Sequence, residues 1–289
     1  MSRVGVLARV TALALAFAVL APAHLILMRV LGRRSDRVPI LFHRAFLRLF
    51  SVRVTQSGTP PGVGEAALVL ANHVSWLDIV AIGSLRPLSF VAKSEVAGWP
   101  LIGQLAGLQR TLYIDRQRRG ATAAVSAAMG HRLAQGELVV LFAEGTTGDG
   151  TRLLPFRSSL VGAARAALQA EAGRGRVRLQ PLAITYSRRN GLPVVRSERA
   201  EIAWFGDMEL APHLSAFVRG GPIDVHVVWG APIAFEAGSD RKLATAAAQA
   251  EVRAALQRAV TGRPAPQAPP VPMPAPDEVA MDRPGVAAT

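Results

Sequence analysis

The chain begins with a long apolar segment. Residues 10–28 carry a single ionisable side chain, His24, and the segment is about as long as a helix that spans the hydrocarbon core of a bilayer. Pro22 interrupts it, which predicts either one kinked membrane-spanning helix or two short helices that enter one leaflet. We therefore expect residues 1–34 to form a membrane anchor.

A cleaved secretory signal is the alternative for the same segment. Arg3 and Arg9 precede it like the basic start of a signal peptide, and Ala21-Pro22-Ala23 resembles a small-residue cleavage site. Arginines also follow the segment, and by the positive-inside rule such residues keep their side of the membrane in the cytoplasm. They are Arg29, Arg33, Arg34, Arg37, Arg44 and Arg48. The pattern favours a retained anchor.

The residues after the anchor show amphipathic helical spacing. Apolar side chains recur there between basic ones, which predicts a helix that continues from the anchor along the membrane interface. The apolar positions are Phe42, Phe46, Leu47, Phe50 and Val52, and the basic positions include His43, Arg44 and Arg48. We assign residues 35–64 to this amphipathic interfacial segment.

From about Glu65 onward, short apolar runs alternate with helical patterns. This alternation predicts an α/β domain over residues 65–261, in which helices flank a central, largely parallel sheet. Residues 262–289 are rich in Pro and Ala and are expected to be a disordered tail. The expected strands are 66–71, 88–92, 111–114, 138–142, 177–186 and 225–229, and the expected helices are 120–134, 159–170 and 241–260.

Composition narrows the chemistry. Cysteine is absent, which excludes disulfides, thiolate metal sites and a cysteine nucleophile. The formal net charge of +13 calls for an anionic partner. Aromatic residues make up only 6% of the chain, and many arginines flank the apolar segment. An anionic membrane surface is therefore favoured over nucleic acid.

One pair of residues suits the activation of a hydroxyl group. His73 and Asp78 follow directly after the apolar run that ends near Asn72. An imidazole can take a proton from an alcohol near neutral pH, and a carboxylate can orient that imidazole. In one straight helix a spacing of five positions would turn the two side chains apart. They can meet only across a turn, with His73 in the connection, Asp78 in a helix, and Ser75 or Asn72 as its cap.

Three further segments lie at or in expected strands, where the sites of α/β folds gather. The first ends a strand with Asp115 and Arg116. The second, residues 141–148, places a carboxylate before a flexible loop with hydroxyl groups that can approach an anion. The third, residues 179–184, contains Pro181, which suggests an edge position, a bulge or a strand start.

Together these segments resemble the motifs of the 1-acylglycerol-3-phosphate acyltransferase family. Asn-His-x4-Asp, Tyr-Ile-Asp-Arg, Phe-Ala-Glu-Gly-Thr and Gln-Pro-Leu-Ala follow one another in that order between Asn72 and Ala183. Residues 91–95 agree as well, and the resemblance covers roughly residues 65–235. It implies a membrane-associated enzyme that moves a fatty acyl group from acyl carrier protein or coenzyme A to the hydroxyl of a lysolipid.

The resemblance also implies roles for individual residues. His73 is expected to be the general base, and Asp78 is expected to orient it. Arg116 is expected to bind a headgroup phosphate. The motif that helps to hold the acceptor is Glu144, Gly145 and Thr146. The implied transfer is direct, with no covalent acyl-enzyme, no bound cofactor and no metal, and the co-substrate is an acyl carrier protein thioester or acyl-CoA.

One position departs from the family pattern. Family members commonly follow Glu-Gly-Thr with arginine, a bidentate partner for phosphate, whereas this chain has the neutral hydroxyl of Thr147. Arg152 or Arg157 can compensate for that missing charge. Otherwise a phosphomonoester headgroup is held less firmly.

Other segments look more like the bacterial subgroup that acylates lyso-ornithine lipid, whose headgroup carries an amine and a carboxylate instead of phosphate. The acidic residues Asp149, Asp207 and Glu209 suit an amine, although acidic loop residues are often only solvated. Both acceptors remain open, as does a strict 1-acylglycerol-3-phosphate acyltransferase. The segments that carry this resemblance are 146–150, 154–160, 204–210 and 212–214.

Two other classes of protein compete with an acyltransferase. A lipid-binding protein without turnover has no need for the base. A metal-dependent hydrolase with His73 and Asp78 as ligands needs further clustered His, Asp or Glu residues. The expected location is the bacterial inner membrane, with the catalytic domain on the cytoplasmic side. A structural or surface role is expected for His131 and His213. The residues expected to be core residues or interfacial anchors are Trp99, Trp204 and Trp229.

Overall fold

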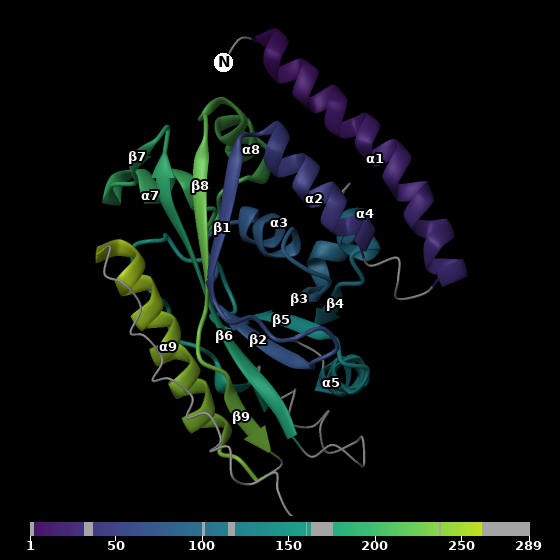
Figure 1. The fold of residues 1–289 in the computed structure, drawn as a ribbon, viewed down its shortest axis with the longest axis vertical. Helices are drawn as coiled ribbons and strands as arrows, with labels where there is room; N and C mark the ends of the chain where they lie inside the picture. Colours follow the sequence, from purple (N-terminus) through teal and green to yellow (C-terminus); the bar gives the residue numbers. More distant parts are fainter. Residues whose placement is uncertain are drawn as a thin grey trace, which may run out of the picture.

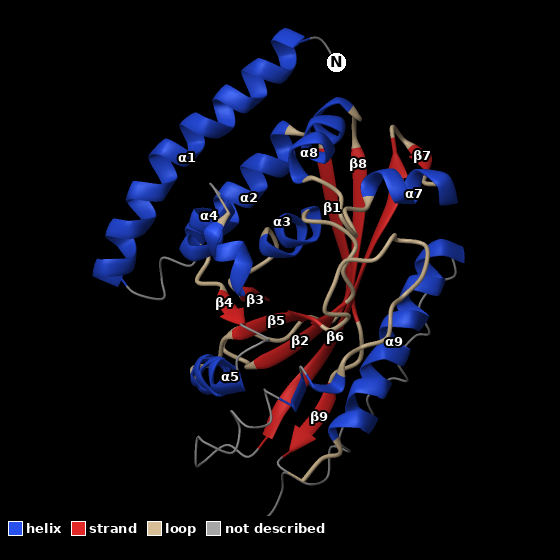
Figure 2. Ribbon diagram, turned by 180° about the vertical axis from the view of Figure 1, so that it is seen from behind, coloured by secondary structure: helices blue, strands red, loops and turns tan. Residues whose placement is uncertain are grey.

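The computed structural model describes residues 3–31, 37–99, 102–114, 119–159, 161–162, 176–236 and 238–261. The strands form a sheet in the order β1-β8-β6-β2-β5-β3-β4, with β7 and β9 also paired to β6 (Figures 1 and 2). The strands are β1 (Val52–Gly58), β2 (Ala67–Ala71), β3 (Ser89–Lys93), β4 (Leu112–Ile114), β5 (Leu138–Phe142), β6 (Arg176–Arg189), β7 (Leu192–Pro193), β8 (Ile223–Trp229) and β9 (Ile233–Glu236). The helices are α1 (Arg3–Leu31), α2 (Arg37–Leu49), α3 (Leu77–Gly83), the 3-10 helix η2 (Ser94–Gly98), α4 (Ile102–Leu108), α5 (Arg119–Ala134), α7 (Arg196–Ile202), α8 (Leu210–Arg219) and α9 (Arg241–Thr261).

The sheet is mostly parallel, as the alternating pattern predicts. β2 pairs in parallel with β5 and β6, and β3 pairs in parallel with β5 and β4. β8 is parallel to β1 but antiparallel to β6. The carboxyl ends of β2, β3, β4 and β5 therefore meet at one edge of the sheet. The expected α/β fold is confirmed.

Two apolar cores cover the two faces of the sheet. Val69 of β2 and Val140 of β5 belong to the core that includes residues of α2 and α3. Leu68 and Val139, the neighbouring residues in each strand, belong to the core that includes residues of α5 and α9. Every residue of β2 and β5 is buried, because parallel strands covered on both faces have no solvent side. Of the expected helix 159–170, most lies outside the described residues.

Pro181 lies inside the sheet, so the expected edge position, bulge or strand start is wrong. β6 pairs with β9 as far as Leu179 and with β8 from Leu182 onward. Pro181 sits where the antiparallel partner changes, and there its missing N–H interrupts neither antiparallel ladder. Its carbonyl still accepts a hydrogen bond from the backbone N–H of Gly230 at 2.9 Å.

The amphipathic segment is helical only in its first part. α2 ends at Leu49 and buries His43, Phe46 and Leu47. Ser51 adopts φ 58, a left-handed conformation that ends the helix. Val52 then begins β1, so its expected place on the helix is wrong. β1 forms by pairing with β8, which lies far along the chain and leaves no local signal.

The N-terminal segment is one helix, α1, which continues through Pro22. Its residues 4–31 are long and apolar enough to cross a membrane, which indicates membrane association. α1 lies beside α2 and α4 along the outside of the domain (Figure 1). The shapes expected for this segment were one kinked span or two short helices, and it forms a single helix.

Candidate active site

The carboxylate of Asp78 organises the turn between β2 and α3. Its Oδ2 accepts hydrogen bonds from His73 Nδ1 at 2.8 Å, from the Val74 backbone N–H at 2.6 Å and from the Ser75 backbone N–H at 2.9 Å. The side chain of Asp78 is 0% exposed. His73 lies in the connection and Asp78 in the first turn of α3, so the pair meets across a turn as its spacing predicts.

Neither expected cap residue caps α3. Trp76 occupies the N-cap position and makes no side-chain cap. The Asn72 Nδ2 group donates to the Ile184 carbonyl at 3.0 Å, and Asn72 Oδ1 accepts from the Ile184 N–H at 2.8 Å. Asn72 thus joins the end of β2 to β6, just beyond the last paired residues of the two strands.

The hydrogen bond to Asp78 sets the tautomer of His73. A carboxylate can only accept, so His73 Nδ1 carries the proton and Nε2 is left as the basic nitrogen. The imidazole stacks on the ring of Phe142, with the centroids 3.7 Å apart and the planes at 12°. The side chain of His73 is 16% exposed, so a base in a fixed orientation remains accessible.

Tyr186 is a further member of this group. Its hydroxyl donates to Asp78 Oδ1 at 2.5 Å, while His73 and the two backbone groups occupy Oδ2. Tyr186 is 4% exposed and projects from β6 into the same core as α3. Burial and the adjacent Asp78 charge raise the pKa of Tyr186 well above its ordinary value, so the phenol keeps its proton. No motif in the sequence marks this residue.

Glu144 supports the same turn from β5. Its Oε1 accepts the backbone N–H of His73 at 2.8 Å, and its Oε2 accepts the backbone N–H of Leu154 at 2.9 Å. Burial raises the pKa of Glu144 to about 7, and the nearby charge of Asp78 contributes to the rise. Glu144 is 3% exposed, and its carboxylate binds backbone on both sides.

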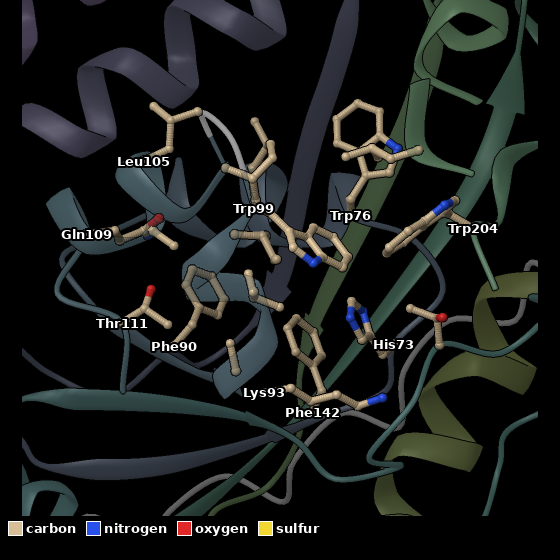
Figure 3. A pocket seen from close by; sticks show the side chains of 18 of the residues that line it. His73, Trp76, Phe90, Lys93, Trp99, Leu105, Gln109, Thr111, Phe142 and Trp204 are labelled. Atoms are coloured by element: carbon tan, nitrogen blue, oxygen red, sulfur yellow. The ribbon is translucent and has the colours of Figure 1, made fainter. Parts of the chain in front are cut away.

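A cavity of about 1200 Å³ opens in front of His73. Its lining comes from the helices α1, α2, α3, η2, α4 and α8, from the strands β3, β4 and β5, and from the loops after β2, after β5 and between α7 and α8. Most lining side chains are apolar or aromatic. Figure 3 shows His73 and Trp204 on one side of this cavity and Leu105, Gln109 and Thr111 on the opposite side. The space is thus large and mostly apolar, with the base in its wall.

The other expected site residues have different positions. Gly145, Thr146 and Thr147 line the cavity beside His73. Arg157 is exposed outside the lining, and its Nε donates to the Glu144 carbonyl at 3.2 Å. Arg116 lies outside the described residues. The structure therefore brings the loop after β5 to the base, and it does not bring Arg157 into the cavity.

Comparison with known proteins agrees with this geometry. An acyltransferase family model matches residues 51–185. A lyso-ornithine lipid O-acyltransferase from Brucella abortus is 43% identical over 249 residues, which cover 86% of this chain and 92% of that protein. One from Rhizobium meliloti is 39% identical over 226 residues, which cover 78% and 77%. The chain belongs to the acyltransferase family.

Two further proteins that this acyltransferase resembles carry a different name. A 1-acyl-sn-glycerol-3-phosphate acyltransferase from Neisseria meningitidis is 34% identical over 125 residues, which cover 43% of this chain and 49% of that protein. The crystal structure of a 1-acyl-sn-glycerophosphate acyltransferase from Thermotoga maritima superposes with a TM-score of 0.59 at 18% identity and covers 89% and 98% of the two chains. The latter likeness concerns the fold.

Four exposed charged side chains line the acyltransferase cavity and form what we call its rim: Lys93, Glu95, Asp207 and Glu209. Lys93 was not expected in the site, although it ends β3 at the same edge of the sheet as His73. Asp149, expected to suit an amine, lies outside the lining and accepts hydrogen bonds from the Thr151 N–H and hydroxyl. Among the described rim residues, acidic groups outnumber basic ones.

Aromatic and imidazole side chains complete the cavity wall. Trp99 and Trp204 meet edge to face, with ring centroids 5.8 Å apart, and both line the cavity. Trp76 also lines it, and its Nε1 donates to Nδ1 of buried His213 at 3.0 Å. Burial lowers the pKa of His213, so the ring stays neutral and can accept this bond. His213 thus contacts the cavity wall through its hydrogen bond with Trp76.

We expect Tyr186→Phe to lower kcat about tenfold with little change in either KM, because Tyr186 contacts Asp78 and loss of one bond to a charged group costs about 1.5–3 kcal/mol. Tyr113→Phe is the matched control, since the Tyr113 hydroxyl bonds the Gly103 carbonyl. A wild-type kcat for Tyr186→Phe would contradict the assigned role.

The pKa of Glu144 predicts a slope in stability against pH. Its value of about 7 in the folded protein exceeds the ordinary 4.5, so stability from this group is full below about pH 4.5 and is lost as pH rises through about 7. Between about pH 5 and pH 8 the loss is about 2 kcal/mol. Thermal unfolding of Glu144→Gln should lack this slope. Glu137→Gln, which removes the ion pair with Arg110, should retain it.

Proposed function

We propose that this acyltransferase moves a fatty acyl group from an acyl carrier protein thioester, or from acyl-CoA, to the free hydroxyl of a lysolipid. The acceptor is lyso-ornithine lipid, 1-acylglycerol-3-phosphate, or both. The observation that carries the proposal is the oriented imidazole of His73 in the wall of a large apolar cavity. A base beside an apolar space suits an alcohol that belongs to a lipid.

The residues support a direct transfer. The acceptor hydroxyl gives its proton to His73 Nε2 while its oxygen bonds to the thioester carbonyl carbon. Asp78 stabilises the imidazolium that forms, because its buried charge lies 2.8 Å from Nδ1. The carbon–sulfur bond then breaks, and the leaving thiolate takes the proton from His73. The proton thus passes from the acceptor hydroxyl to the leaving thiol, His73 returns to its neutral form, and no covalent acyl-enzyme is needed.

The rim favours an acceptor with an amine. The rim carries three acidic side chains, Glu95, Asp207 and Glu209, and one basic side chain, Lys93. This excess of negative charge disfavours binding of a phosphomonoester but suits a headgroup with one amine and one carboxylate. Thr147 replaces the arginine that is common in the family, and this replacement also favours an acceptor without phosphate. Relatives named lyso-ornithine lipid O-acyltransferases also match far more of the chain than the named 1-acylglycerol-3-phosphate acyltransferase does. We therefore favour lyso-ornithine lipid as the main acceptor.

A strict 1-acyl-sn-glycerol-3-phosphate acyltransferase of phospholipid synthesis is the second candidate. It needs a cationic pocket for phosphate, for which the chain offers Lys93 and Arg116. Two other classes have less support. A non-catalytic lipid-binding protein gives no reason for the His73–Asp78 pair. A metal-dependent hydrolase lacks its ligands, since no group of three or more His, Cys, Asp or Glu suited to a metal occurs among the described residues.

We further propose the bacterial inner membrane as the location, with the catalytic domain on the cytoplasmic side. The apolar helix α1 and the arginines beside it support this orientation, because basic residues next to a span stay in the cytoplasm. The net charge of +13 suits an anionic membrane surface, and acyl thioesters of carrier protein and coenzyme A are cytoplasmic molecules.

We expect His73→Ala and Asp78→Ala each to lower acyl transfer by at least about a thousandfold, since general base catalysis and its electrostatic support are both lost. Both variants should still bind membranes. His131→Ala is the control, because His131 is an exposed residue of α5 outside the cavity lining. Near-wild-type turnover by His73→Ala would show that His73 is not the general base.

The rim generates a prediction about the acceptor. We expect Asp207→Asn combined with Glu209→Gln to raise KM for lyso-ornithine lipid about tenfold and to leave KM for 1-acylglycerol-3-phosphate unchanged or lower, because the charges that face the amine are removed. Glu251→Gln on α9 is the control, since it removes an acidic group outside the cavity lining. Equal changes for both acceptors would argue against recognition of the amine.

A further inference from the structure

The hairpin of β6 and β7 carries exposed apolar side chains. Leu192 is 71% exposed, and Val195, at the N-cap of α7, is 56% exposed. Pro193 is exposed as well, whereas Val194 packs into the core. Single exposed apolar side chains are common on proteins, but three within four positions form a small apolar patch. We call Leu192, Pro193 and Val195 the apolar tip.

The apolar tip is held firmly on the domain. Asn190 and Gly191 have φ values of 52° and 82°, as in the tight two-residue turn that joins twisted antiparallel strands. The Asn190 backbone N–H donates to the Pro222 carbonyl at 2.8 Å, and Nη1 of Arg189 forms an ion pair with Glu201 of α7 at 2.5 Å. The hairpin therefore presents its apolar side chains from a fixed position.

Basic side chains flank the apolar tip on both sides. Arg188 and Arg196 are exposed, and neither forms an ion pair within the part of the chain that the structure describes. The carboxylate of Glu198, in the first turn of α7, accepts the backbone N–H of Val195 at 3.1 Å. Apolar side chains with arginines on either side are typical of surfaces that enter the interface of an anionic membrane.

The hairpin lies at the same end of the molecule as the beginning of the apolar helix α1. Figures 1 and 2 show β7, α7 and α8 at this end, with α8 between β7 and α1, whereas β9 and the beginning of α9 lie at the opposite end. Val4 and Leu7 of α1 are 78% and 67% exposed, and Leu214 of α8 is 37% exposed. A lipid surface at this end can therefore meet α1, α8 and the hairpin together.

We propose that the hairpin is a second membrane contact of the protein, in addition to α1. Leu192 and Val195 enter the interface of the bilayer, and Arg188 and Arg196 bind anionic lipid headgroups. The apolar side chains leave water there, and the long arginine side chains keep their charged groups at the level of the headgroups. One apolar helix leaves the domain free to rotate about it, whereas a second contact fixes the orientation of the domain on the membrane.

The charges favour lipid over a second copy of the chain as the partner of the apolar tip. In a symmetric dimer through this tip, Arg188 and Arg196 of one copy would approach the same arginines of the other copy. The net charge of +13 adds to that repulsion. An anionic bilayer has the opposite charge and is already indicated by the long apolar helix.

The test places a spin label on the apolar tip of the full-length protein. The chain has no cysteine, so Leu192→Cys and Leu243→Cys each provide one attachment point for a nitroxide. Leu243 is the matched control, because it is also 71% exposed, follows Arg241 and Lys242, and belongs to the beginning of α9. The vesicles contain equal parts of phosphatidylglycerol and phosphatidylcholine. We expect the ratio of collisions with dissolved oxygen to collisions with a water-soluble nickel chelate to be several-fold higher at position 192, because oxygen concentrates in hydrocarbon.

A double substitution tests the headgroup contacts. Arg188→Gln combined with Arg196→Gln, in the labelled Leu192→Cys protein, removes two charges from the membrane surface. The equilibrium between the inserted and the free tip should fall about thirtyfold, which lowers the collision ratio. Vesicles of phosphatidylcholine alone should lower the ratio in the same way. Arg241→Gln combined with Lys242→Gln is the matched control and should leave the ratio unchanged.

Three results would overturn the second membrane contact. Equal collision ratios at positions 192 and 243 would show that the apolar tip stays in water. A high ratio at position 192 that responds neither to the loss of the arginines nor to the loss of phosphatidylglycerol would show that anionic headgroups do not bind there. Spectral broadening by neighbouring labels at position 192 would show that the tip contacts a second copy. The collision ratios do not depend on acyl transfer, so they test this contact independently of the proposed function.

Discussion

The buried carboxylate of Asp78 is the interaction on which the site depends. A charge removed from water must be compensated by hydrogen bonds, and Asp78 receives four, from His73, Tyr186 and two backbone groups. These bonds set the tautomer of His73 and the shape of the turn before α3. They also join the turn to β6. A change at Asp78 thus alters the base, the loop and the sheet together.

A second buried carboxylate complements the first. Glu144 accepts backbone groups from the His73 turn and from the loop that follows β5, so it holds the two halves of the site together. Burial raises the pKa of Glu144 to about 7, with a further contribution from the charge of Asp78, whereas Asp78 itself is surrounded by donors. The two carboxylates lie in different environments and have different roles: Asp78 orients the base, and Glu144 binds backbone N–H groups.

The sequence predicted the features that depend on residues close together in the chain. Buried strands such as β2 and β5 are continuous apolar runs, and the pair of His73 and Asp78 lies within one turn, so both were visible in the sequence. Tyr186 was not, because it meets Asp78 across 108 positions of chain. The predicted position of Pro181 is wrong for the same reason, since the change of partner strand beside it depends on residues that are far away in the sequence. The cavity wall of α1 was hidden because both faces of that helix are apolar.

In the proposed reaction, an imidazole oriented by Asp78 activates a lysolipid hydroxyl. The most direct measurement offers the purified full-length protein lyso-ornithine lipid and 1-acylglycerol-3-phosphate in parallel, with a labelled acyl carrier protein thioester or acyl-CoA, and follows the label by mass spectrometry. We expect the label to appear as an ester on the lysolipid, with lyso-ornithine lipid preferred. Release of free fatty acid alone, or no reaction with either acceptor, would show that the protein does not catalyse this transfer.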